Sequence, residues 1–401
     1  MNFRFSFFVF LSLFCASFLS AQTSDRISLI WLSIADENAQ TVSVSWASPE
    51  PGSSTVFYGP DAECKETAQA DGDSVLHHVR IPVGKVVGPD ARCFYRVETV
   101  TPDGRKFTSG LNSFKTLSTK ELRLVFVGNI HTKTISDAAA RLDPHVIFLT
   151  GDIVPCLHEG GKLNKESARL NVLPFRRLVQ NNQALFVSTL LMPCLGNHDR
   201  EIAPRGERVE GPSQFYDPEA TAFRTFFDLP CDEWKWFFDW EPLSLRIVAL
   251  DLNHTYDFGT SLQTCHDWHR GSDQFEWYDR VSREGGEKRF MVTFQNEQCS
   301  AMRNKENGEW HKMFSRGTCM IAGFGHYAER AETSDGMTYF NTSHYGRGDK
   351  YADPKKVFCE SVDNFLLVTV RPKEFTAGLR DWNTGAPLEA SLIRKVGPAA
   401  D

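Results

Sequence analysis

The sequence lacks an excess of positive charge. It contains 44 Lys and Arg against 51 Asp and Glu, which gives a formal net charge of −7. Proteins that bind nucleic acid present a basic surface to the phosphate backbone, so we expect no nucleic-acid partner. Internal repeats and low-complexity segments are also missing. Because hydrophobic residues make up 41% of the chain, a disordered or fibrous protein is excluded.

Long hydrophobic runs are missing after residue 21, and the one such run stands before it. Phe5–Leu19 is almost wholly apolar, Arg4 precedes it, and small residues end it at Ala21. This order is typical of a secretory signal peptide. A membrane anchor is the alternative, but the run is shorter than the ~20 residues that a spanning helix needs. We therefore expect a signal peptide at residues 1–21, a secreted or periplasmic location, and no membrane span in the mature chain.

Cysteine usage fits an exported protein. The sequence has ten cysteines, of which Cys15 lies in the predicted leader. Oxidising compartments favour disulfides, and Cys64 and Cys93 are a plausible pair because they are the only two in the first mature segment. The pairing of the other seven stays open. Buried thiols that pack as small hydrophobic side chains are the alternative.

Short strands separated by turn residues fill the first mature segment. Residues Thr41–Trp46 alternate polar and apolar side chains, as a half-buried strand does. Pro49–Gly52 and Pro102–Gly104 have the composition of turns. Regular strand spacing without helical periodicity predicts a β-sandwich over residues 22–118, with Trp46 and Tyr95 in its core.

The pattern changes at about residue 119. Leu122–Val127 and Val146–Thr150 are apolar strands, and the segment between them can form a helix. A strand, helix, strand order predicts a parallel sheet, so we expect an α/β domain over residues 119–395. Later strands are expected at Leu185–Ser188, Leu245–Leu250, Phe290–Thr293, Thr318–Ala322, Met337–Asn341 and Phe365–Val370.

Polar motifs follow several of these strands. They are Gly128–His131, Thr150–Asp152, Leu195–Asp199 and Ile321–Arg330. Each motif is weak alone, since a single histidine is more often structural than a ligand. Together, at strand ends, they supply imidazole, carboxylate and amide groups, which are ligands for metals.

These motifs resemble those of the calcineurin-like metallophosphoesterases. The resemblance is strongest to the purple-acid-phosphatase-like group, whose members carry an N-terminal fibronectin type III-like domain. Gly151-Asp152, Gly196–Asp199 and Ala322–Arg330 are similar to three catalytic blocks of the family, and Phe57–Gly59 with Trp46 is similar to the signature of the N-terminal domain. The resemblance implies two mixed sheets flanked by helices and a dinuclear metal centre that hydrolyses phosphate esters.

The sequence departs from the family pattern at three positions. The first block normally reads Asp-x-His, and here Asn129 precedes Ile130 and His131. The fourth block normally ends a strand with a histidine ligand, where this chain has Gln295. The last block normally reads Gly-His-x-His, and here Phe324 replaces its first histidine.

By this resemblance the losses fall unevenly on the two metal positions. One position keeps Asn129, His131, Asp152 and His326, whereas the other keeps only the shared Asp152 and Asn197. Two imidazoles and a carboxylate can hold a transition metal, whereas Gln295 is a weak donor and Phe324 donates nothing. We therefore expect one weakly held metal (Fe, Zn or Mn), and a second metal is unlikely on these ligands.

The resemblance also implies the catalytic residues. His198 would act on the phosphoryl group as an acid or hydrogen-bond donor, and Asp199 would orient its ring. Three hypotheses remain open. The chain is an exported phosphate ester hydrolase with a depleted mononuclear site, or a non-catalytic relative that binds a phosphorylated ligand, or a structural protein in which these residues are relics.

Five further residues have two interpretations each. Arg200, Arg205 and Arg208 follow the third motif and could bind an anionic ligand, although a solvated loop is the simpler interpretation. His254 and His344 follow predicted strands and could add ligands, although ordinary loop histidines are more common.

Overall fold

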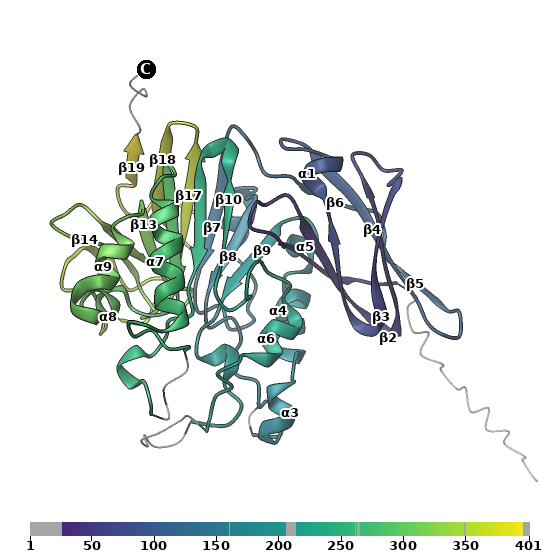
Figure 1. Ribbon diagram of the computed structural model, residues 1–401, viewed down its shortest axis with the longest axis horizontal. Coiled ribbons are helices and arrows are strands. Elements are labelled where there is room, and N and C mark those ends of the chain that lie inside the picture. Colours follow the sequence, from purple (N-terminus) through teal and green to yellow (C-terminus); the bar gives the residue numbers. More distant parts are fainter. Residues whose placement is uncertain are drawn as a thin grey trace, which may run out of the picture.

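The computed structural model describes residues 26–159, 161–205, 214–260, 262, 265–348 and 350–395. The predicted signal peptide and Arg208 lie outside these ranges. A β-rich N-terminal region stands beside a larger α/β region, as Figure 1 shows. Within the described ranges, no helix combines the length and the apolar character needed to cross a membrane.

The N-terminal region is built around one long antiparallel strand. Its strands are β1 (Leu29–Ile34), β2 (Val42–Gly59), β3 (Glu66–Ile81), β4 (Arg92–Val100), β5 (Lys106–Thr108) and β6 (Asn112–Lys115), with the short helix α1 (Val83–Val86). Strand β2 pairs with β1, β3 and β4. Trp46 and Tyr95 are fully buried, which confirms their predicted place in the core.

The turn predicted at Pro49–Gly52 is wrong. Strand β2 runs through this segment, and its register against β3 shifts between Ala47 and Gly52. Proline cannot donate to a strand ladder, and a β-bulge is a place in a sheet where that loss is tolerated. The prolines therefore mark an irregular stretch of one strand.

The expected pair of Cys64 and Cys93 is not formed in the structure. Both are buried free thiols. The Sγ of Cys64 donates to the carbonyl oxygen of Asp61 and the Sγ of Cys93 to that of Phe94, each at 3.7 Å. The two side chains act here as small core residues, which is the alternative that the sequence left open.

Two sheets form the α/β region. The first has the order β19-β18-β17-β7-β8-β9 and the second the order β10-β11-β12-β13-β15-β14-β16. Strands β7, β8 and β9 are parallel, as are β11, β12, β13 and β15. The strands of the first sheet are β7 (Leu122–Val127), β8 (Val146–Thr150), β9 (Leu190–Cys194), β17 (Asn364–Arg371), β18 (Glu374–Asp381) and β19 (Leu392–Lys395). Those of the second are β10 (Trp236–Trp240), β11 (Leu245–Ala249), β12 (Phe290–Gln295), β13 (Cys319–Ala322), β14 (Ala328–Glu332), β15 (Thr338–Asn341) and β16 (Lys356–Glu360).

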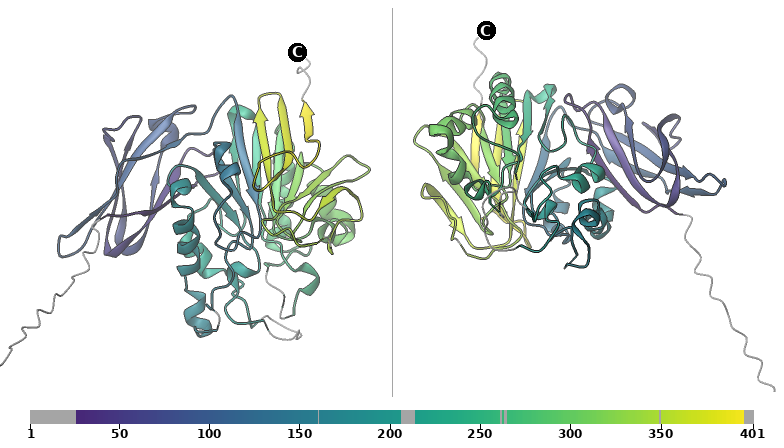
Figure 2. Two further views of the ribbon diagram at one scale, coloured as in Figure 1. Left: turned by 180° about the vertical axis from the view of Figure 1, so that it is seen from behind. Right: turned by 60° about the horizontal axis from the view of Figure 1, so that its bottom comes forward.

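Helices flank these sheets, as the views in Figures 1 and 2 show. They are α2 (Asp137–Arg141), α3 (Lys165–Arg169), α4 (Leu173–Asn181), α5 (Gln183–Phe186), α6 (Thr221–Phe226), α7 (Asp273–Gly285), α8 (Cys299–Arg303) and α9 (Glu309–Phe314). The strand expected at Leu185–Ser188 is wrong, because α5 ends there and the buried strand β9 follows it. A short apolar run cannot be assigned to helix or strand by its pattern alone. The other five strands expected after residue 180 are confirmed as β11, β12, β13, β15 and β17.

Aromatic side chains fill the space between the two sheets. Phe126 and Phe148 of the first sheet stack with ring centres 4.4 Å apart. Phe294 of the second sheet meets both edge-on, at 5.6 and 5.4 Å. Such offset and edge-to-face contacts are the favoured geometries of buried rings. This core fixes the two sheets against each other and so fixes the loops at their strand ends.

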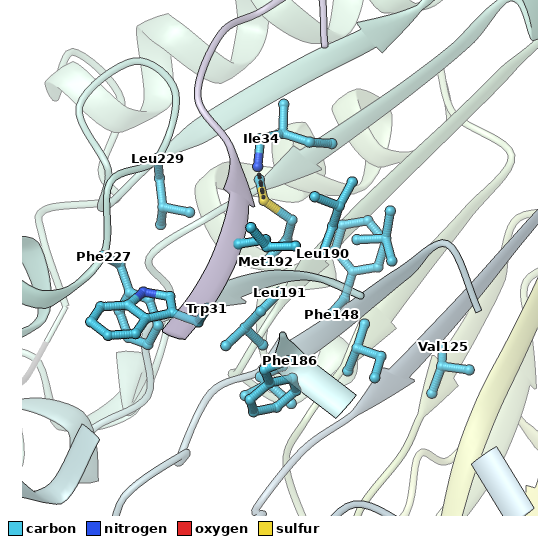
Figure 3. Close-up of a cluster of buried hydrophobic side chains, with 14 of the residues drawn as sticks. Trp31, Ile34, Val125, Phe148, Phe186, Leu190, Leu191, Met192, Phe227 and Leu229 are labelled. Carbon is cyan, nitrogen blue, oxygen red and sulfur yellow. Dashed lines mark hydrogen bonds between the residues drawn. The ribbon is translucent and has the colours of Figure 1, made fainter. Parts of the chain in front are cut away.

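The N-terminal region and the first sheet are joined through β1 and β9. Leu32 pairs with Leu190 in parallel, so one continuous sheet crosses the junction. Figure 3 shows the buried cluster at this seam, where the backbone N–H of Ile34 donates to the Sδ of Met192 at 3.2 Å. Trp31 stacks on Phe226 with ring centres 4.3 Å apart. The β-rich region is therefore a fixed part of the body that carries the site.

Candidate functional site

The four strand-end motifs meet at one edge of the two sheets. They follow β7, β8, β9 and β13 in the chain. A cavity of about 420 Å³ lies there, lined by His131, Pro155, His198, His326, Tyr345 and Arg347. The structure therefore brings together three of the histidines that the sequence singled out.

The backbone at this site adopts unusual conformations. Asn129, His131, Asp152 and His326 have φ values of 53°, 44°, 52° and 55°, which lie in the left-handed region. For a residue other than glycine, such a conformation costs about 1–3 kcal/mol in free energy, and residues with these backbone angles cluster at functional sites. The fold therefore holds these four side chains in place against a local cost.

Two glycines let the loops approach closely. A Cβ at Gly196 would collide with Asp152, and a Cβ at Gly323 would collide with Thr150. Only glycine allows the third motif to lie against the second, and the last motif to lie against the end of β8.

The ring of His131 lies close enough to the buried carboxylate of Asp152 for the two groups to interact electrostatically. Burial lowers the pKa of His131 to about 4, so its ring is neutral at neutral pH. Burial opposes the charge of Asp152, but the rings of His198 and His131 and a backbone N–H bond from His198 lower its pKa overall. The site thus combines one buried negative charge with the neutral ring of His131.

His198 is held by two bonds. Its Nδ1 lies 2.7 Å from the carbonyl oxygen of Pro155, and its Nε2 lies 2.9 Å from Nη2 of Arg205. A carbonyl can only accept and a guanidinium can only donate, so Nδ1 carries the proton and Nε2 accepts. The ring also meets His131 edge-on, with centres 5.0 Å apart.

The expectation that Asp199 orients His198 is wrong. Asp199 is fully buried, and its carboxylate accepts from the backbone N–H groups of Ile153, Val154 and Gly196 at 2.7–3.0 Å. It therefore ties the second motif to the third, while the carbonyl of Pro155 orients the ring of His198. The sequence places Asp199 next to His198 but does not reveal which way its carboxylate points.

Asn129 is fixed by its amide nitrogen. That nitrogen donates to the carbonyl oxygen of Gly323 at 2.6 Å and to Oγ of Ser343 at 3.1 Å. Two acceptors therefore face this position. An aspartate there would offer them no donor, which gives a local reason why asparagine stands where the family pattern has aspartate.

Asn197 connects Asp152 with two further side chains. When its amide is oriented to satisfy its neighbours, the nitrogen donates to Oδ1 of Asp152 and to Nε2 of His254, each at 3.2 Å, and the oxygen accepts from Arg205. His254 is therefore part of the site, through Asn197. Arg205 also donates from Nε to Oε2 of Glu201 at 2.9 Å.

Neither of the two degenerate positions supplies an imidazole. Gln295 is fully buried and donates to the carbonyl oxygen of Glu297 at 3.1 Å, while its Oε1 has no partner within the described residues. The ring of Phe324 lies edge-on to His254 and Tyr351. An apolar ring thus occupies the side of the site where the family pattern has a histidine.

These residues fit a metal centre only in part. The donor chemistry of His131, Asp152 and His326 suits a transition metal, and Nδ1 of His326 is buried with no partner in the described part of the chain. However, no three His, Cys, Asp or Glu side chains in the described ranges are grouped closely enough to hold an ion. The residues do not fit the dinuclear centre, and we derive no reaction step through a metal.

Other residues divide between the cavity and the core. Arg200 is fully buried and pairs with Asp251 at 2.7 Å, so it does not serve a ligand. His344 stacks on Trp382 and does not line the cavity. Sequence reasoning missed Tyr345 and Arg347, although both follow strand β15, and the rule that sites gather at strand ends could have found them.

The fold and the strand-end position of this site are similar to those of metal-dependent phosphoesterases. Residues 122–314 match the model of the calcineurin-like phosphoesterase family. Its members are metal-dependent phosphoesterases, so a divalent or transition metal and a phosphate ester are the class of cofactor and substrate to consider. No protein of curated function matches the sequence.

Solved structures agree on the fold. The purple acid phosphatase PPD1 from yellow lupin seeds superposes with a TM-score of 0.68 at 11% identity, covering 92% of this chain and 74% of that one. The structure of PhoD superposes with a TM-score of 0.61 at 12% identity, covering 93% of this chain and 90% of that one. The two mixed sheets flanked by helices, expected from the resemblance, are confirmed.

Proposed function

We propose that this chain binds a phosphorylated ligand in the histidine-lined cavity and does not hydrolyse it at the rate of a two-metal phosphoesterase. The cavity lining carries the proposal. His131, His198 and His326 surround it together with Arg347. Imidazole N–H groups of His131 and His326 and the guanidinium of Arg347 can donate to phosphate oxygens, and the fork of arginine suits them especially well. Both ring nitrogens of His198 are already bonded, so that ring shapes the cavity and does not donate to the ligand.

Further positive charge stands beside the cavity. Tyr345 lies between two cations, with Nζ of Lys133 at 4.0 Å and the guanidinium carbon of Arg347 at 4.6 Å from its ring centre. Its ring also meets those of His131 and His326 edge-on. These contacts hold the two cations beside Tyr345 of the cavity lining, where they attract an anionic ligand.

Weak hydrolysis follows from the same positions. Gln295 and Phe324 remove two imidazoles from the family pattern, and Asn129 removes an anionic oxygen. Charge stabilisation of the transition state is commonly the largest part of such catalysis. Without the second metal position, that stabilisation falls.

A phosphate ester hydrolase with one weakly held Fe, Zn or Mn is the second candidate. Two observations favour it: His131 is neutral because of its low pKa, and Nδ1 of His326 has no partner in the described ranges. A metal held by His131, Asp152 and His326 would supply an activated water. The phosphate ester of either candidate is a small molecule or a phosphorylated partner.

Calorimetry with inorganic phosphate tests the proposal. The purified protein is titrated in EDTA and again after dialysis against Zn²⁺, Mn²⁺ or Fe²⁺, with metal content measured by elemental analysis. A phosphate ester screen runs on the same samples. Phosphate binding in EDTA with negligible turnover in every sample supports the proposal. Turnover that rises with about one bound metal per chain favours the second candidate.

We also propose that the mature protein is exported after cleavage of residues 1–21. The support is the charged start, the apolar run and the small residues at its end. Intact mass spectrometry of the protein recovered from the exported fraction tests this. A measured mass equal to that of a chain starting at Gln22 supports export. Recovery of the full-length chain from the cytosol contradicts it.

A further inference from the structure

One arginine joins four parts of the site. Arg205 donates from Nε to the carboxylate of Glu201 at 2.9 Å and from Nη2 to Nε2 of His198 at 2.9 Å. Nη2 also meets the amide oxygen of Asn197. Its charge also interacts with that of the buried Asp152.

Glu201 anchors this arginine. Glu201 is 6% exposed, and its other oxygen lies 3.3 Å from Nε2 of His158, so the carboxylate has little freedom to move. The side chain of Arg205 is one-third exposed, at 33%, so the guanidinium stands at the boundary between the buried part of the site and solvent. A held cation at that boundary is in reach of an incoming ligand.

The guanidinium of Arg205 donates hydrogen bonds to two atoms of the site whose lone pairs could otherwise coordinate a metal ion. Asn197 gives its oxygen to Arg205, and His198 gives its one free ring nitrogen. The family resemblance assigns Asn197 and Asp152 to the second metal position. A metal ion at that place would have to lie beside a fixed positive charge, which like-charge repulsion disfavours.

For an anion, the electrostatic effect of Arg205 is attractive. The charge of Asp152 alone would repel a phosphate from the cavity. Arg205 offsets that charge, and within the described residues its Nη1 has no hydrogen-bond partner. This nitrogen remains available to donate to a phosphate oxygen.

We propose that Arg205 is a resident cation that takes the place of the second metal, offsetting Asp152 and binding a phosphate oxygen directly. This inference rests on the proposed binding of a phosphorylated ligand. It assigns the ligand a phosphate group, because Arg205 bonds His198 of the cavity lining and Arg347 belongs to that lining.

Two variants test this role in the full mature chain. Arg205→Met keeps most of the aliphatic part of the side chain and removes its charge. Arg205→Lys keeps the charge and removes the planar guanidinium. Calorimetry in EDTA should show inorganic phosphate binding weakened about tenfold or more by Arg205→Met, with Arg205→Lys in between. Zn²⁺ titration of Arg205→Met should show tighter binding than in the wild type.

Arg283→Met is the matched control. Arg283 lies on α7, its side chain is 67% exposed, and its partner is Asp279 in the same helix. Phosphate affinity in this variant should stay within about twofold of the wild type, as for an exposed ion pair. An equal loss in both variants would contradict a specific role for Arg205.

A ligand-independent readout separates the two proposals. In ¹⁵N-histidine-labelled protein, the ring of His198 should carry its proton on Nδ1, and the shift of Nε2 should change in Arg205→Met. A wild type that binds no phosphate overturns the proposed function. Phosphate binding that Arg205→Met leaves unchanged overturns the role of Arg205 alone, as does a His198 proton on Nε2.

Discussion

The side-chain nitrogen of Asn129 donates to the carbonyl oxygen of Gly323 at 2.6 Å, which joins the first and last loops of the site. The two residues are far apart in the sequence, on loops that follow β7 and β13. Both are held closely, since Asn129 is 2% exposed and a Cβ on Gly323 would collide with Thr150. The site is therefore built for asparagine at this position.

Asn129→Asp should destabilise the protein and should not restore metal binding. The carboxylate would face the carbonyl of Gly323 and the hydroxyl of Ser343 without a donor for the carbonyl. We expect a loss of about 1–3 kcal/mol in the free energy of unfolding, measured by urea denaturation. Addition of Zn²⁺ should leave the melting temperature unchanged.

Asn112→Asp is the matched control for this prediction. Asn112 makes the same kind of bond, from its side-chain nitrogen to the carbonyl of Gly110 at 3.0 Å, and it is a half-buried residue at the start of strand β6. Water can replace that bond, so the loss should be under about 1 kcal/mol. A Zn²⁺-dependent rise of the melting temperature in Asn129→Asp would show that the position still serves a metal.

Asp199→Asn should cost about 3 kcal/mol of stability. The carboxylate accepts three backbone N–H groups with its two oxygens, and an amide has only one oxygen to offer them. Urea denaturation measures the loss. Because Pro155 orients the ring of His198, the ¹⁵N shifts of that ring should barely change. A changed tautomer of His198 would mean that Asp199 acts on it after all.

The sequence predicted the parts of this site that depend on chain order. Apolar runs placed β7, β8, β12 and β13, and the strand-end rule then placed His131 and His326 at one cavity. His198 was placed there by its motif, although the strand expected before it was wrong. These inferences succeed because parallel strands bring their carboxyl ends to one edge of a sheet.

Orientation could not be predicted in the same way. Nothing in the sequence distinguishes an Asp199 that faces His198 from one that faces the backbone, since a rotation of one side chain separates the two. Arg205 had two interpretations for the same reason, because a long side chain on a loop is placed by its partners, here Glu201 and His198. The segment at Leu185–Ser188 failed differently, since its apolar pattern suits either a helix end or a strand.

Stability should fall as the pH drops from about 6.5 to about 4, partly because of His77. This residue is 1% exposed, stacks on Trp46 and bonds Ser48 and Ser54 at 2.8 Å. Burial lowers its pKa to about 4. Between the two values the unfolded chain binds more protons than the folded one, so acid favours unfolding, and above pH 6.5 this contribution is constant.

His77→Gln isolates this contribution. Urea denaturation at pH 7 and pH 5 should show that the wild type loses up to about 2 kcal/mol more than the variant between the two conditions. A pH dependence that is the same in His77→Gln and the wild type would contradict the buried neutral ring.

Asp152→Asn distinguishes phosphate binding without a metal from binding through one. The amide keeps an oxygen that can accept from the backbone N–H of His198, at 3.2 Å in the wild type, so the loops should stay in place. Without a metal, loss of the negative charge removes a repulsion beside the cavity, and calorimetry in EDTA should show phosphate binding strengthened by about threefold to tenfold. If phosphate instead binds through a metal on Asp152, the same variant should lose both the metal and the phosphate. Elemental analysis of the calorimetry sample separates these outcomes, because only the second requires a metal in the wild type.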